Sequence, residues 1–134
     1  MIKDVDIVLD GTDNFESRFE INKVCVDHKK PLVSAAVIRF EGQVSVFKGY
    51  EKDQPCYQCL YTEEGDDNES CVQNGVLAPV AGLIGTIQAL QAIKVILSLG
   101  DELCGTLLLV DGLDLSFRKV KIGKDLKCPI CNSN

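Results

Sequence analysis

The sequence has 134 residues, of which 46% are hydrophobic, and its formal net charge is −6. A chain of this length can bury one hydrophobic core, so we expect a single domain or a piece of one. The acidic charge opposes contact with phosphate backbones, which argues against nucleic-acid binding. No signal-peptide pattern precedes the first apolar run, so we expect a cytoplasmic protein whose seven cysteines stay reduced.

The first third of the sequence has the pattern of a strand, a helix and a second strand. Residues 5–9 form a short apolar run typical of a strand buried on both faces. A helix is predicted over residues 14–27, and Asp13 with Glu16 three residues later forms a capping-box pattern at its start. Residues 32–38 form another apolar strand and complete a βαβ unit. The inner side of the helix would carry Phe15, Phe19, Ile21, Val24 and Cys25.

Three further strands are predicted after this unit. A turn at residues 40–43 leads into the first of them, at residues 44–47, which is expected to run antiparallel to its predecessor. The other two cover residues 106–111 and 115–122. Between these strands lies an acidic stretch at about residues 62–70, which has little to bury and is expected to form a mobile loop.

A long apolar helix is predicted over residues 76–99. Its polar side chains form one narrow stripe at helical spacing, made of Gln88, Gln91, Lys94 and Ser98. The segment is long enough to span a bilayer, but in a membrane this stripe would face lipid, so we expect no membrane insertion. The helix has more apolar surface than one small sheet can cover, and we therefore expect a homodimer through this region.

Two Cys-x-x-Cys pairs stand out, Cys56 with Cys59 and Cys128 with Cys131. Together they offer the four thiolates of a closed tetrahedral zinc site, in which no position remains open for water or substrate. The alternatives are two independent turns or a redox dithiol, but a redox pair needs only one such motif. We expect a structural zinc ion that ties the last predicted strand to a loop in the middle of the chain.

Asp10 and Asp13 follow the carboxyl end of the first predicted strand, the edge at which open α/β sheets bind ligands. A carboxylate there can hold Mg²⁺ against the phosphates of a nucleotide, although helix capping is the stronger interpretation of Asp13 from the residues alone. The sequence contains neither G-x-G-x-x-G nor G-x-x-x-x-G-K-[ST]. It can therefore contain at most half of a nucleotide site.

The sequence resembles the carboxyl-terminal half of the MoeB/ThiF family, which is similar to ubiquitin-activating enzymes. The likeness covers nearly the whole chain, as part of one domain over residues 1–134. It rests on motifs in a fixed order: Asp10-Gly11-Thr12-Asp13-Asn14 with Arg18 and Asn22, Pro31 to Ser34, Glu41-Gly42-Gln43, Pro55 to Cys59, Cys71, Gly75 to Pro79, Gly85 to Lys94, and Cys128-Pro129-Ile130-Cys131.

The resemblance implies an α/β fold, a Rossmann-like mixed sheet with flanking helices, closed by the four-cysteine zinc site. It also implies adenylation by Mg-ATP of the carboxyl-terminal glycine of a ubiquitin-like sulfur-carrier protein, in thiamine or molybdopterin synthesis, by a homodimer. Asp13 matches the family's magnesium and nucleotide aspartate. Arg18 matches an arginine of the family, and its alternative role is a surface salt bridge to Asp10 or Glu16. The family's phosphate-binding loop has no counterpart in this sequence.

Cys71 matches the family cysteine proposed to join a carrier through sulfur or thioester chemistry. Five acidic residues precede it closely, and clustered negative charge raises the pKa of a thiol and lowers its thiolate fraction. We expect either a nucleophile that reacts only with a bound carrier or a spare surface thiol. The alternative to an enzyme is a zinc-stabilised module that binds a protein partner or dimerises without catalysis.

Overall fold

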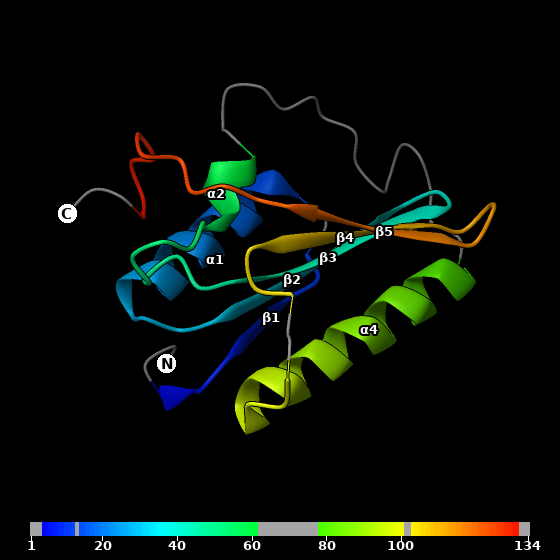
Figure 1. Cartoon of the computed structure of the whole chain (residues 1–134), viewed down its shortest axis with the longest axis horizontal. Coiled ribbons are helices and arrows are strands. Elements are labelled where there is room, and N and C mark those ends of the chain that lie inside the picture. The colour runs from blue at the N-terminus through cyan, green and yellow to red at the C-terminus, as the bar shows by residue number, and fades with distance from the viewer. Residues whose placement is uncertain (1–3, 13, 62–77, 101–102, 132–134) are drawn as a thin grey trace.

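A computed structural model describes residues 4–12, 14–61, 78–100 and 103–131, and its centre is a five-stranded mixed sheet (Figure 1). The strands lie in sequence order, from β1 to β5, and only β1 and β2 are parallel. The strands are β1 (Val8–Asp10), β2 (Leu32–Ile38), β3 (Glu41–Phe47), β4 (Thr106–Asp111) and β5 (Ser116–Lys121). The predicted α/β class with a mixed sheet is confirmed.

Helices cover both faces of the sheet (Figure 1). Val33 and Val44 pack against α4 (Ala78–Leu97) in one core cluster. Leu32 and Phe47 pack in a second cluster with residues of α1 (Phe15–Asp27) and of the short α2 (Tyr57–Leu60). Neighbours along a strand point to opposite faces, which explains why Leu32 and Val33 belong to different clusters.

Strand β1 differs from its prediction. It covers three residues, pairs Val8 with Leu32 and Asp10 with Ser34, and forms one edge of the described sheet. Leu9 is 47% exposed, so the expectation of a strand buried on both faces is wrong for the described part of the chain. The reason is its edge position, where only Asp10 is buried.

The start of α1 also differs from the capping-box prediction. Asn14 has extended backbone angles and its side-chain oxygen accepts a hydrogen bond of 2.8 Å from the Ser17 amide, so Asn14 is the N-cap. A box between Asp13 and Glu16 would require the cap one residue earlier. The predicted turn at residues 40–43 is likewise displaced, because β3 already begins at Glu41.

The polar stripe of α4 is turned largely toward the sheet. Gln91 is buried and accepts a 2.9 Å hydrogen bond from the Leu103 amide, while Gln88 donates to the carbonyls of Asp10 and Val33 at 3.1 and 3.0 Å. By length and composition α4 could cross a membrane, yet it lies along β2 and β3. The opposite side exposes a row of large apolar side chains, Leu90, Ile93, Ile96 and Leu97.

We predict that Gly42→Ala destabilises the protein because a methyl group there would lie 2.3 Å from two side-chain carbons of the buried Ile84. Such overpacking costs about 1–3 kcal/mol. The measurement is the free energy of unfolding in urea. Gly123→Ala is the matched control, since no described atom lies within 4 Å of a methyl group at that position. Equal stability of the two variants would contradict the packing of β3 against α4.

Candidate functional site

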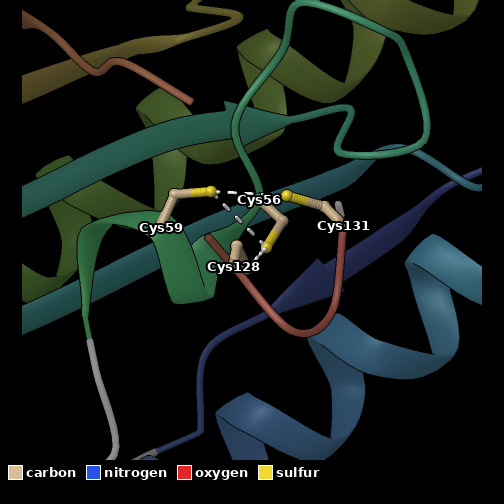
Figure 2. Close-up of side chains that lie close together, drawn as sticks. All are labelled: Cys56, Cys59, Cys128 and Cys131. Atoms are coloured by element: carbon tan, nitrogen blue, oxygen red, sulfur yellow. Dashed lines mark hydrogen bonds between the residues drawn. The ribbon is translucent and has the colours of Figure 1, made fainter. Parts of the chain in front are cut away.

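The four predicted ligand cysteines converge into one cluster (Figure 2). All four sulfurs lie within 4.8 Å of one another, and the cysteines are free rather than disulfide-bonded. The Sγ–Sγ distances are 4.0 Å for Cys56–Cys59, 3.7 Å for Cys56–Cys128 and 3.4 Å for Cys59–Cys131. Tetrahedral zinc with Zn–S bonds of about 2.3 Å requires separations of about 3.8 Å. The donor set and its dimensions could therefore hold a metal ion such as zinc.

Each cysteine pair sits in a tight local turn. Cys56 is the N-cap residue of α2, and its carbonyl accepts a 3.0 Å hydrogen bond from the Cys59 amide. The second pair follows β5, and the Cys128 amide donates to the Asp125 carbonyl at 3.0 Å. Lys124, just before the second pair, donates from its Nζ to the carbonyls of Gly49 and Glu51, which lie between β3 and the first pair.

The pKa values within the cluster differ in direction, and Cys59 is the cysteine whose thiolate form is favoured. A hydrogen bond from Cys56 lowers the pKa of Cys59 to about 5, assisted by the Asp125 amide, which lies 3.4 Å from the Cys59 sulfur. The bond to Cys59 and burial raise the pKa of Cys56, and burial raises the pKa of Cys131 to about 12. A metal ion binding here must displace protons from the thiols with raised pKa, so its affinity falls as the pH falls.

Buried polar groups line the carboxyl edge of β1. Asp10 is 1% exposed, and its Oδ1 accepts a 2.8 Å hydrogen bond from the Thr12 amide. Asp10 Oδ2 and Thr12 Oγ1 are buried and have no hydrogen-bond partner among the described residues. Two acceptor oxygens are thus held in the loop that leads to Asp13, although Asp13 itself lies outside the described residues.

Arg18 does not form the surface salt bridge that we considered. It is 7% exposed, and its guanidinium donates to the Thr12 carbonyl and, at 3.0 Å, to the Ala35 carbonyl. Through these two hydrogen bonds the guanidinium group links the loop after β1 to β2. The residues that flank Arg18 in the sequence, Ser17 and Phe19, gave no sign of this inward orientation.

A cavity of about 670 Å³ adjoins this edge of the sheet. Its lining includes Thr12 and Arg18 from the loop and α1, together with Ser34, Gln43 and Tyr61. Tyr61 donates a hydrogen bond from its hydroxyl to Gln43 Oε1. Ser34 and Tyr61 were not predicted as site residues; only the position of Ser34 on a strand beside the edge could have indicated it.

The structure brings together part of the predicted site. The four cysteines meet, and Asp10 lies at the predicted edge of the sheet. Cys71 and the acidic stretch at residues 62–70 lie outside the described residues, as does Asp13.

Helix α1 separates the cysteine cluster from this edge. The distance along α1 from Asn14 to Asn22 is about 12 Å at 1.5 Å per residue, and Asn22 contacts the Tyr57 amide beside Cys56. The cysteine cluster and the carboxyl edge of β1 therefore lie beside different parts of α1, separated by about 12 Å along its axis.

Comparison with curated proteins identifies adenylyltransferases as relatives. The molybdopterin-synthase adenylyltransferase of Haemophilus influenzae is 47% identical over 127 residues, which cover 95% of this chain and 52% of that protein. The protein of the same name from Escherichia coli is 40% identical and covers 98% and 52%. The adenylyltransferase and sulfurtransferase MOCS3 of Caenorhabditis briggsae is 42% identical and covers 98% and 33%. The chain thus spans about half the length of these bacterial relatives, and less of MOCS3.

Solved structures share the fold at low sequence identity. Escherichia coli MccB matches with a TM-score of 0.75 and 17% identity, covering 96% of this chain and 39% of that chain. A heterocyclase solved with substrate and cofactor matches with a TM-score of 0.76 and 15% identity, covering 95% and 21%. The ThiF family itself matches over residues 1–130. With nearly the whole sequence matched, this chain belongs to the ThiF family.

Proposed function

We propose that this chain forms the carrier-binding and zinc-binding half of an enzyme that uses ATP to adenylate the carboxyl-terminal glycine of a ubiquitin-like sulfur-carrier protein. The observation that carries the proposal is identity of 40–47% to bacterial molybdopterin-synthase adenylyltransferases over nearly the whole chain. These names favour molybdopterin synthesis over thiamine synthesis. Cytoplasmic location is part of the proposal, since a reducing compartment keeps thiols available to zinc.

The carboxyl edge of β1 supports a nucleotide role for Asp13. The capping role that competed with it belongs to Asn14, so the helix does not need the Asp13 carboxylate for its N-cap. The buried oxygens of Asp10 and Thr12, which have no partner among the described residues, lie in the same loop and are of the oxygen-ligand type that Mg²⁺ prefers. Asp13 would hold Mg²⁺, with Asp10 and Thr12 close by.

The reaction joins the carrier's carboxylate to the α-phosphate of ATP and releases pyrophosphate. Mg²⁺, when bound, supplies charge neutralisation for the phosphates. The residues of this chain hold the loop that carries Asp13. Arg18 binds the Thr12 carbonyl from below, and Gln88 clamps the carbonyls of Asp10 and Val33. Fixing the loop before reaction avoids reorganisation during the chemical step.

The lining of the cavity fits an extended peptide end. Gln43 and Tyr61 offer polar side chains along β3 and after α2, and Phe15 and Leu60 add apolar surface. A carrier tail ending in glycine has no bulky side chain and could lie along this surface with its carboxylate directed toward Thr12. In this role Cys71 would attack the carrier adenylate as a thiolate, form a thioester and release AMP.

The four-cysteine centre is proposed to hold structural zinc. Four sulfurs complete its coordination, so it can fix geometry but cannot activate water. A second candidate function is a zinc-stabilised binding or dimerisation module without catalysis. One observation favours it: the exposed apolar side of α4.

We predict that the full-length protein exchanges pyrophosphate with ATP only when a Gly-Gly-ended carrier is present. Asp13→Asn should reduce the exchange rate by about 100-fold or more, because an electrostatic stabiliser of the transferring phosphate is lost. The measurement is incorporation of labelled pyrophosphate into ATP. Absence of exchange with the carrier would leave the non-catalytic module as the better function.

Cys71→Ala is the control for this experiment. It should leave pyrophosphate exchange nearly unchanged and abolish any covalent adduct between protein and carrier, since adenylation precedes thioester formation. An adduct that survives the substitution would place the sulfur chemistry at another residue.

We predict about one zinc ion per chain in the purified protein, and a loss of zinc in Cys128→Ser because a buried thiolate ligand is removed. Hydrogen exchange should then become faster around residues 56–61 and 116–131 while β2 stays protected. Cys104→Ser is the matched control, since Cys104 lies outside the cluster and contacts Gln54. Less than about half an equivalent of zinc in the wild-type protein would refute the site.

We further propose that a second copy of the chain covers the exposed side of α4. Leu90 is 54% exposed and Ile93 is 50% exposed on a helix whose opposite side is packed on the sheet. No described atom lies within 4 Å of a methyl group placed at Gly82 or Gly85, so another backbone could approach the helix closely there. A helix surface of this kind is unfavourable in water unless it is covered.

Ile93→Arg should convert the expected dimer into a monomer, because a charge would be placed in an apolar interface. Light scattering at tens of micromolar measures the mass. Leu113→Arg is the control: its side chain is 73% exposed but lies on the β4–β5 turn. A monomeric wild-type protein would refute the dimer, and sedimentation of that protein with lipid vesicles would indicate a membrane instead.

A further inference from the structure

Asn22 is a buried amide that joins α1 to the first cysteine pair. It is 1% exposed, and its Oδ1 accepts a 2.9 Å hydrogen bond from the Tyr57 amide, the residue after Cys56. Its Nδ2 is buried without a hydrogen-bond partner of ordinary geometry among the described residues. An amide nitrogen left unpaired inside a protein costs about 1–3 kcal/mol, so this half of the side chain calls for an acceptor.

Cys56 is the ligand that most needs a donor. Four thiolates around one Zn²⁺ leave about two units of negative charge to be stabilised by the surroundings. Cys59 is partly exposed and receives the Asp125 amide at 3.4 Å. Cys56 is 0% exposed, so water cannot solvate its sulfur.

The geometry of the Asn22 side chain places a free donor beside this ligand. Its Oδ1 is fixed on the amide of Tyr57, the residue that follows Cys56, so the other half of the planar amide group is held next to the same turn. That half is Nδ2, a buried donor without a partner among the described residues. A metal-bound thiolate sulfur is an acceptor for an N–H group of this kind.

We propose that Asn22 is a positioning residue of the metal centre: its Nδ2 donates a hydrogen bond to the metal-bound Cys56 thiolate while its Oδ1 holds the Tyr57 amide. This inference rests on the proposed zinc site. Hydrogen bonds of this kind orient ligands and stabilise their charge, and their loss typically weakens metal binding by about 10–100-fold. One side chain would thus form hydrogen bonds with both the sulfur of Cys56 and the backbone amide that follows it.

Helix α1 carries a second buried polar side chain, Arg18, which contacts the loop at the carboxyl edge of β1. Arg18 and Asn22 are four residues apart, so they share one side of α1. Arg18 binds the Thr12 carbonyl of the loop, and Asn22 binds the turn of Cys56. One side of α1 therefore contacts both the proposed metal centre and the loop at the carboxyl edge of β1.

The test compares two identical substitutions on one helix in the full-length protein. Asn22→Asp keeps the acceptor for the Tyr57 amide but replaces the donor with a carboxylate oxygen beside the thiolate. We expect zinc release to a chromogenic chelator to become at least about tenfold faster. Asn14→Asp, which keeps the cap of α1, should stay within about twofold of the wild type. Release from Asn22→Asp within twofold of the wild type would overturn the proposal.

A second measurement uses the wild-type protein and so does not depend on whether a variant folds. The protein is labelled with ¹⁵N and loaded with ¹¹³Cd in place of zinc. A hydrogen bond from Asn22 to a metal-bound sulfur should give scalar coupling between the side-chain amide protons and the metal. Metal-loaded protein without this coupling overturns the role of Asn22 alone, whereas protein that binds no metal overturns the site and this inference together.

Discussion

Buried polar side chains must find partners, and this requirement organises the structure around its two long helices. Removing a polar group from water costs free energy that only a hydrogen bond can offset. Arg18 on α1, with Gln88 and Gln91 on α4, meets this requirement by binding backbone groups of loops and strands. Asn22 on α1 meets it with its Oδ1 alone. The groups that they bind include the carbonyl of Ala35 in β2 and the amide of Leu103 before β4. The two long helices are thereby tied to the sheet and its loops by hydrogen bonds as well as by apolar packing.

The parts of the structure that the sequence predicted are those that depend on local pattern or on ligand chemistry. The βαβ unit and the antiparallel strands follow from apolar periodicity, and the cysteine cluster follows from two matched pairs. Two matched Cys-x-x-Cys pairs are typical of a single metal site, so the convergence of the four cysteines could be predicted from residue type and spacing.

The orientation of the polar residues could not be predicted in the same way. Arg18 and Gln91 have side chains that are usually exposed, and nothing within their own helices indicates an inward direction. Their partners, the carbonyl of Ala35 and the amide of Leu103, become available only after the chain has folded. The cap of α1 was misplaced by one residue for a smaller reason, because Asp13 and Asn14 are both good caps and the choice depends on the path of the preceding loop.

The cysteine pairs also limit the order in which the chain can fold. Cys56 and Cys128 are 72 positions apart, and bringing such distant residues together costs roughly 4 kcal/mol of chain entropy before any constant term. The β2–β3 hairpin joins residues that are close in sequence and can form early. The four cysteines lie on both sides of β4 and β5 in the sequence, so during synthesis the cluster cannot close until residue 131 has left the ribosome. A metal ion that needs all four sulfurs would therefore bind only after every described strand has been synthesised.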